Sequence, residues 1–183
     1  DLATGPGVNN AQVQTFDAET LNAFMSDMLT IDRDYDYRVD VSYMGSVIND
    51  GSLPWRGKIH RMTMNDCTAT PCSTSTWGLL LSGKRVPTEV LDTFPTSGTI
   101  EMGPMTAGVA VAIDDADKLW VFAGSGRYFS VPDKTSTEQQ YFVGVKDAVL
   151  NGSCTESTKI NCHGDDLVDL SNAQVCLLGV GNC

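Results

Sequence analysis

The fold class is decided by the stretch Ala107-Gly-Val-Ala-Val-Ala-Ile113, Asp114-Asp-Ala-Asp-Lys118, Leu119-Trp-Val-Phe-Ala123. Two apolar runs of strand length flank an aspartate-rich turn, which is the pattern of a β-hairpin. Many short strands separated by Gly, Pro, Ser and Asp turns are typical of a sandwich, barrel or propeller. The sequence therefore predicts an all-β fold, with further strands at 39–43, 58–64, 76–81 and 140–145.

One segment departs from the strand pattern. Its apolar residues recur at the i, i+3, i+4 and i+7 positions of an amphipathic helix, which predicts a short helix over residues 17–28. Within the predicted strands, buried β faces account for the large aromatic side chains, so we expect Trp77, Trp120 and Phe122 in the core.

The run Asp32-Arg33-Asp34-Tyr35-Asp36-Tyr37-Arg38-Val39-Asp40 is the strongest functional signal. Its aspartates fall at positions 1, 3, 5 and 9, where an acidic loop supplies oxygen ligands to Ca²⁺, and position 7 supplies its backbone carbonyl. A solvated acidic turn is the alternative. The spacing predicts one Ca²⁺ held by the carboxylates of Asp32, Asp34, Asp36 and Asp40 and by the carbonyl of Arg38.

Two features of this loop are unusual. Position 6 is Tyr37, where such loops carry Gly because the chain turns sharply there. A bulky residue with a positive φ is an outlier, so Tyr37 counts against a loop of this kind. Position 12 is Tyr43, so no bidentate Glu is present and Asp40 would have to take that role.

Charge and cysteine content narrow the classes of function. The 183 residues carry a net charge of −11, which argues against nucleic-acid binding because that function needs a basic surface. No apolar run is long enough to span a membrane. An even number of cysteines, 6 in all, indicates an oxidising compartment. Many disulfide pairings remain open, and proximity in sequence favours Cys67–Cys72, Cys154–Cys162 and Cys176–Cys183. The last four cysteines lie in a tail at 151–183, which follows a main unit at 1–150.

A longer motif carries a resemblance. Leu119-Trp-Val-Phe-Ala-Gly-Ser-Gly-Arg-Tyr128 and Gln139-Gln-Tyr-Phe-Val-Gly144 follow an upstream Asp-rich loop and Trp55-Arg56. In this order they resemble the C-terminal β-propeller of the PilY family of type IV pilus tip and biogenesis proteins, over roughly residues 25–172. Tyr37 in place of Gly, the insertion with Cys67 and Cys72, and the tail after Leu170 depart from the family pattern.

The resemblance implies that residues 1–150 form part of a β-propeller with a calcium loop at 32–40, followed by a disulfide-rich tail. It implies a non-enzymatic protein outside the cell, on a pilus or the outer cell surface, with roles in pilus assembly, retraction control or adhesion. The implied partners are the upstream part of the same protein, other pilus-tip subunits, pilins, and a host or surface ligand. The chain is too short for a full propeller and begins at Asp1, so we expect a longer polypeptide to complete its strand edges.

Two other classes of function stay open. A quinone-cofactor dehydrogenase also uses a propeller, although the sequence offers no convincing acid–base or nucleophile–base pair. A structural subunit of an extracellular filament could pair its open edge with a neighbour. Gly124-Ser-Gly-Arg127 lacks the context of a phosphate loop and is expected to be a tight turn in which Arg127 bonds locally or faces solvent. Asp114–Asp117 is expected to be a solvated hairpin tip.

Overall fold

The computed structural model describes residues 16, 18, 22–49, 51, 55–64, 77–92 and 103–147. Strands dominate this part of the chain, and its one helical segment is the short 3₁₀ helix η2 (Val131–Thr135). The all-β prediction is confirmed. The strands are β1 (Ala23–Ile31), β2 (Val41–Ile48), β3 (Lys58–Thr63), β4 (Leu79–Leu81), β5 (Lys84–Val86), β6 (Thr88–Asp92), β7 (Ala110–Ile113), β8 (Leu119–Gly124) and β9 (Phe142–Lys146).

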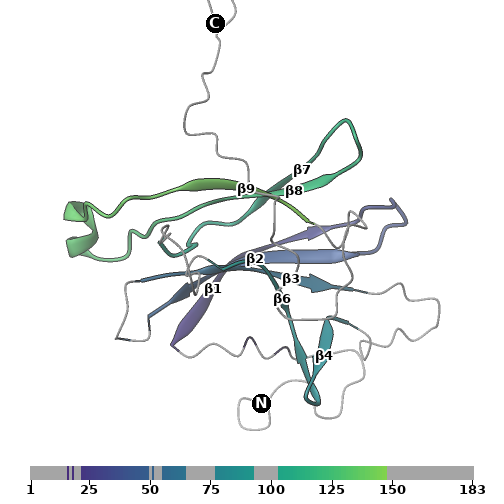
Figure 1. Cartoon of the computed structure of the whole chain (residues 1–183), viewed down its shortest axis with the longest axis horizontal. Helices are drawn as coiled ribbons and strands as arrows, with labels where there is room; N and C mark the ends of the chain where they lie inside the picture. The colour runs from purple at the N-terminus through teal and green to yellow at the C-terminus, as the bar shows by residue number, and fades with distance from the viewer. Residues whose placement is uncertain are drawn as a thin grey trace, which may run out of the picture.

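The strands form two antiparallel sheets and a small hairpin (Figure 1). One sheet has four strands in the order β1-β2-β3-β6, and the other has three in the order β7-β8-β9. Strands β4 and β5 pair with each other as a separate hairpin. Within the described residues, no helix is long and apolar enough to cross a membrane.

The core lies between the two sheets, which form two layers in Figure 1. Along β8, buried residues alternate with partly exposed ones, as expected for a strand with one face on the core. Leu119 and Val121 are fully buried on that face, and they join Val145 of β9. The sheet of β1 contributes Val41, Tyr43, Ile59, Val90 and Leu91 to the same cluster.

The helix predicted over 17–28 is wrong for the described part of that segment, where β1 begins at Ala23. A bulge explains the misleading pattern. Residues Met25 and Met28 pair with Ser46 and Met44, so β1 advances three residues while β2 advances two. The bulge therefore places Met25 and Met28, which are three residues apart, on the same face of the strand, as they would be in a helix.

The prediction that Trp120 and Phe122 lie in the core is also wrong. Both side chains are on the face of β8 opposite the core residues Leu119 and Val121, and both are partly exposed. Trp77 is likewise partly exposed. The apolar run 119–123 has apolar residues on both faces, so the sequence alone did not distinguish the inner from the outer face.

Most of the predicted strands are found, and β5 and β6 were missed. Pro87 lies between these two strands, and it interrupts the strand pattern while the chain passes from the small hairpin into the larger sheet. The predicted disulfide pairs and the cysteine-rich tail 151–183 lie outside the described residues.

Candidate metal site in the acidic loop

The acidic loop, residues 32–40, connects the neighbouring antiparallel strands β1 and β2. Its two ends are joined by a hydrogen bond in which the Asp40 N–H donates to the Ile31 carbonyl at 2.9 Å. The Asp40 carbonyl accepts the Met64 N–H at 2.7 Å, just beyond β3. The base of the loop is therefore held by three strands.

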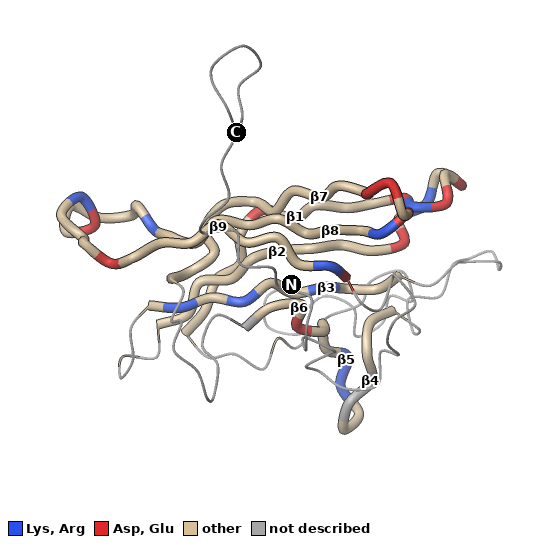
Figure 2. Tube along the Cα trace, turned by 45° about the horizontal axis from the view of Figure 1, so that its top comes forward, with Lys and Arg blue, Asp and Glu red and all other residues tan. Residues whose placement is uncertain are grey.

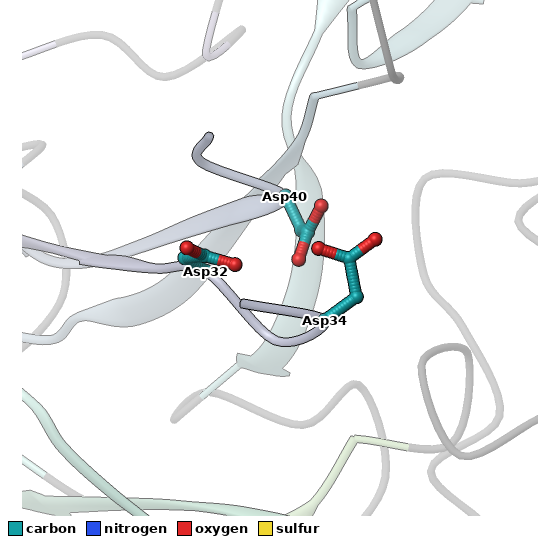
Figure 3. A group of neighbouring side chains, drawn as sticks. All are labelled: Asp32, Asp34 and Asp40. Carbon is teal, nitrogen blue, oxygen red and sulfur yellow. The ribbon is translucent and has the colours of Figure 1, made fainter. Parts of the chain in front are cut away.

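Three of the predicted ligands come together. One carboxylate oxygen from each of Asp32, Asp34 and Asp40 lies within 4.8 Å of the others (Figure 3). The Asp34 and Asp40 carboxylates point toward each other, and that of Asp32 lies beside them. The buried Oδ1 of Asp32 has no hydrogen-bond donor among the described residues. A buried, unsatisfied carboxylate oxygen is costly, so this atom calls for a cation or an ordered donor.

Backbone hydrogen bonds fix the orientation of these side chains. The Asp32 Oδ2 accepts the Tyr37 N–H at 2.8 Å, and the Asp40 Oδ2 accepts the Arg33 N–H at 2.6 Å. The Asp34 Oδ1 accepts the Asp36 N–H at 3.1 Å. Each carboxylate is therefore held by one oxygen, which orders the group before any ion binds.

Asp36 and Arg38 are not gathered into this group. The Asp36 Oδ1 accepts the Arg38 N–H at 2.8 Å, and its Oδ2 lies 3.7 Å from the Arg38 Nε. Asp36 is thus engaged by a cation of the loop itself. To join Asp32, Asp34 and Asp40 at an ion, its side chain would have to turn away from Arg38.

The loop backbone turns sharply at Tyr37 although that position is not glycine. Tyr37 has a φ of 70°, the left-handed conformation in which such loops carry glycine at position 6, and Tyr35 also has a positive φ of 64°. A non-glycine residue in this conformation costs about 1–2 kcal/mol. The Tyr37 side chain is 98% exposed, so it gains no packing to offset that cost.

The donor set suits a hard cation. Carboxylate oxygens are preferred by Ca²⁺, Mg²⁺ and Mn²⁺, whereas softer metals prefer the thiolates and imidazoles that this group lacks. Ca²⁺ accepts six to eight oxygens in flexible geometry, so carbonyls and water could complete the shell around three carboxylates. Without a cation, each pair of charges at this separation repels by about 1 kcal/mol in water and more where solvent is excluded.

A second acidic turn lies beside the loop (Figure 2). The Arg33 Nη2 donates to the Asp117 carbonyl at 2.9 Å and lies 3.6 Å from its Oδ2, which joins the loop to the β7–β8 turn. In that turn the Asp114 Oδ1 accepts the N–H groups of Ala116 and Lys118, both at 2.9 Å, and its Oδ2 accepts the Trp120 indole N–H. These bonds, that of Trp120 first, lower the pKa of Asp114. The turn is a hairpin tip, as predicted.

The Gly124–Arg127 segment is also a local structural feature. The Arg127 Nη2 lies 3.1 Å from the Asp133 Oδ1, and the guanidinium carbon lies 4.4 Å from the centre of the Trp55 ring. Of the two outcomes expected for Arg127, the structure shows bonding within the protein. Backbone donation from Ser130 is the main cause that lowers the pKa of Asp133. The capping role of Asp133 was missed, although Ser130 followed by an acid three residues later is a recognisable signal.

A buried carboxylate cluster links the two sheets and was missed by sequence reasoning. Asp147, which follows β9, accepts the Tyr43 hydroxyl through Oδ2 and pairs with the Arg61 guanidinium through Oδ1, both at 2.5 Å. All three side chains are almost fully buried. Burial raises the pKa of Tyr43, and the charge of Asp147 raises it further. We call Tyr43, Arg61 and Asp147 the β9 cluster.

A buried serine of β2 and a buried histidine of β3 resemble a nucleophile–base pair. The Ser46 Oγ lies 3.2 Å from the His60 Nε2, and His60 pairs in register with Glu89. Lys58 binds Glu89 at 2.8 Å, and its N–H donates to the Ser46 Oγ. Ser46, His60 and Glu89 are each at most 1% exposed, so no substrate reaches the serine in this conformation. The group ties β2, β3 and β6 together.

The comparisons with known proteins give no match: no family model, no curated protein and no solved structure is similar enough to place this chain in a family.

Proposed function

We propose that this chain is a non-enzymatic Ca²⁺-binding β domain, and that the acidic loop holds one Ca²⁺ ion. The observation that carries the proposal is the convergence of Asp32, Asp34 and Asp40 within 4.8 Å around a buried, unpartnered oxygen of Asp32. A merely solvated turn would be expected to spread its carboxylates apart, because like charges repel.

In this proposal the three gathered carboxylates are the primary ligands. Asp36 joins them after releasing Arg38, the Arg38 carbonyl supplies a neutral oxygen, and water completes the shell. The ion removes the repulsion among the carboxylates and fixes the strained backbone at Tyr35 and Tyr37. At a Ca²⁺ concentration of 100 times its dissociation constant, a site of this kind adds about 2.7 kcal/mol to the free energy of unfolding.

We further propose that the domain is part of a partial β-propeller in a pilus-associated tip or biogenesis protein outside the cell. The support is the resemblance, together with packing among its motif residues. The Ser125 hydroxyl donates to the Gln140 Oε1 at 2.9 Å and accepts the Tyr141 N–H at 2.8 Å. Outside these motif segments, the Gln140 side chain fills the space beside Gly103, where a Cβ would lie 2.5 Å from its Oε1. The motif thus works as one packed unit.

Calorimetry tests the calcium site. The 183-residue chain, treated with chelator, is titrated with CaCl₂. We expect one binding event per chain in the unsubstituted protein, and a loss of affinity of at least tenfold in Asp34→Asn, which removes a gathered ligand. Asp115→Asn is the matched control, because it removes the same charge from an exposed residue of the neighbouring turn. No binding heat and no rise in melting temperature with Ca²⁺ would refute the site.

The propeller proposal has its own test. The chain is expressed alone and together with the sequence upstream of it in its source, and the oligomeric state and melting of both are measured. Aggregation of the chain alone, relieved by the upstream sequence, supports completion of its strand edges by that sequence. A soluble monomer with a sharp cooperative transition contradicts it.

A further inference from the structure

The outer face of the β7-β8-β9 sheet has the composition of an inner face. In register, the residues on this face of β8 are Trp120, Phe122 and Gly124, and their neighbours are alanines on β7 and Phe142, Gly144 and Lys146 on β9. Lys146 is the one charged member of this set. An antiparallel sheet with one side toward water normally carries polar residues on that side, so an apolar outer face indicates a binding surface.

Three rings on this face form a row. Trp120 and Phe122 have ring centres 6.3 Å apart with an angle of 14° between their planes. Phe122 and Phe142 follow with 6.2 Å and 13°. The rings are therefore nearly parallel across two strands, and Phe142 is 76% exposed at the open end of the row. We call Trp120, Phe122 and Phe142 the aromatic row.

The surrounding residues hold the aromatic row in place. The Asp114 Oδ2 accepts the Trp120 indole N–H at 2.9 Å, which fixes the orientation of the indole. The Lys146 Nζ lies 4.8 Å from the Trp120 ring centre. Phe122 leans over Gly144, where a Cβ would lie 2.7 Å from the ring. A row ordered in this way before binding loses little side-chain entropy when a ligand arrives.

The size of the row does not fit a stable protein partner. Three aromatic side chains offer about 450–750 Å² of contact area when fully free, and two of them are already partly covered. A stable protein interface needs about 800 Å² on each partner. A second copy of the chain would also bring another net charge of −11 to the contact.

The charge of the chain decides between the two remaining classes of ligand that stack on parallel aromatic rings, nucleic acids and neutral sugars. Stacked nucleobases bind such rows on other sheet surfaces, but their phosphates need a basic surround, and this chain is acidic. A neutral sugar chain has no such requirement. Pyranose rings present a face of C–H groups with slight positive charge, which the electron-rich aromatic system attracts, while their hydroxyls can accept a hydrogen bond from the Lys146 ammonium.

We propose that the aromatic row binds a neutral polysaccharide, with Phe142, Phe122 and Trp120 in contact with successive parts of the sugar chain and Lys146 at one end. This surface is distinct from the acidic loop, so the proposal does not depend on the calcium site. It gives the domain a means of attaching to a glycan-coated surface.

Affinity electrophoresis in native gels tests this proposal, with hydroxyethylcellulose, xylan, galactomannan or dextran as the probe. We expect at least one of these polymers to retard the 183-residue chain. Phe142→Ala should weaken the retardation severalfold in apparent affinity, because it removes the contact area of one ring. This variant should fold, because Phe142 is largely exposed. Tyr128→Ala is the matched control, since Tyr128 is an aromatic residue outside the row and is 71% exposed, close to the 76% of Phe142.

Further measurements separate the rival occupants. Binding to a neutral polymer should be unchanged by added salt and by excess oligothymidine, whereas binding to a nucleic acid would weaken with salt. Failure of all four polymers to retard the chain would overturn the proposal, as would equal retardation of Phe142→Ala and the unsubstituted protein. Self-association in sedimentation that disappears in Phe142→Ala would also overturn it, and would mark the row as an interface between two copies.

Discussion

The acidic loop and the β9 cluster both depend on aspartates, and their charges are compensated in different ways. In the β9 cluster, Arg61 and Tyr43 each engage one oxygen of Asp147, and the whole group is buried. In the acidic loop, Asp32, Asp34 and Asp40 converge on one another, and the nearby guanidinium of Arg38 is turned to Asp36 instead. The protein supplies a positive charge to Asp147 in the β9 cluster, whereas no described residue supplies one to the converging carboxylates of the acidic loop.

This difference shows what distinguishes a structural carboxylate from a candidate cation ligand. Burial of Asp147 is tolerable because a cation and a hydroxyl donor are fixed beside it. The loop carboxylates belong to residues that are exposed (Asp34) or partly exposed (Asp32 and Asp40), so their mutual repulsion costs less than burial of Asp147 would, although one oxygen of Asp32 is buried. A site that binds and releases Ca²⁺ needs this second arrangement.

The largest expected effect comes from removing the internal cation of the β9 cluster. Arg61→Met leaves the Asp147 charge buried without its guanidinium, and we expect a loss of about 3–5 kcal/mol in the free energy of unfolding, measured in urea. Arg38→Met is the control, because Arg38 pairs with Asp36 at the surface and should change stability by less than about 1 kcal/mol. Equal losses in the two variants would mean that burial does not separate the two regions.

The next effect concerns the hydroxyl donor of the same cluster. Tyr43→Phe removes the bond to Asp147 and should cost about 1–3 kcal/mol at neutral pH. Because the pKa of Tyr43 is raised in the folded protein, its contribution is complete below the unfolded value of about 10 and falls as the pH rises above it. The difference between the unsubstituted protein and Tyr43→Phe should therefore shrink above about pH 10.

Urea denaturation at a series of alkaline pH values measures this change. Tyr35→Phe provides the comparison, because Tyr35 is 78% exposed in the acidic loop. That variant should keep the same stability relative to the unsubstituted protein across the series. A constant difference for Tyr43→Phe would show that the buried hydroxyl does not titrate on unfolding.

The two regions also differ in what the sequence could predict. The gathering of Asp32, Asp34 and Asp40 follows from local spacing within one loop, so the sequence was sufficient to predict it. The engagement of Asp36 by Arg38 was not anticipated, because two groups within the loop compete for the same carboxylate. In the β9 cluster, Asp147 is 86 positions from Arg61 and 104 positions from Tyr43 in the sequence. The cluster therefore depends on strand register and sheet packing, which no local pattern reveals.

The fold shows the same division between local and distant causes. Apolar runs bounded by turn residues predicted most strands correctly. The facing of Trp120 and Phe122 was mispredicted because both faces of β8 are apolar, and β1 was mispredicted because a bulge shifts its period. Both errors arise from contacts with neighbouring strands, which decide where a residue points after the strand itself is specified.

The smallest expected effect is a change in the free energy of unfolding that depends on Ca²⁺ in the acidic loop and not in the β9 cluster. In chelator, Asp34→Asn should leave the stability of the chain unchanged or raise it by up to about 1 kcal/mol, because it removes one of three repelling charges. The asparagine Oδ1 can still accept the Asp36 N–H, so the loop keeps its hydrogen bond. In saturating Ca²⁺ the same variant should be less stable than the unsubstituted protein, because it has lost a ligand.

Asp147→Asn should instead be destabilised equally with and without Ca²⁺, since Arg61 loses its counter-charge in both conditions. Urea melts of both variants in chelator and in CaCl₂ measure the four values. If Asp34→Asn were destabilised in chelator as strongly as in Ca²⁺, the loop carboxylates would be structural, and their convergence would not indicate a cation site.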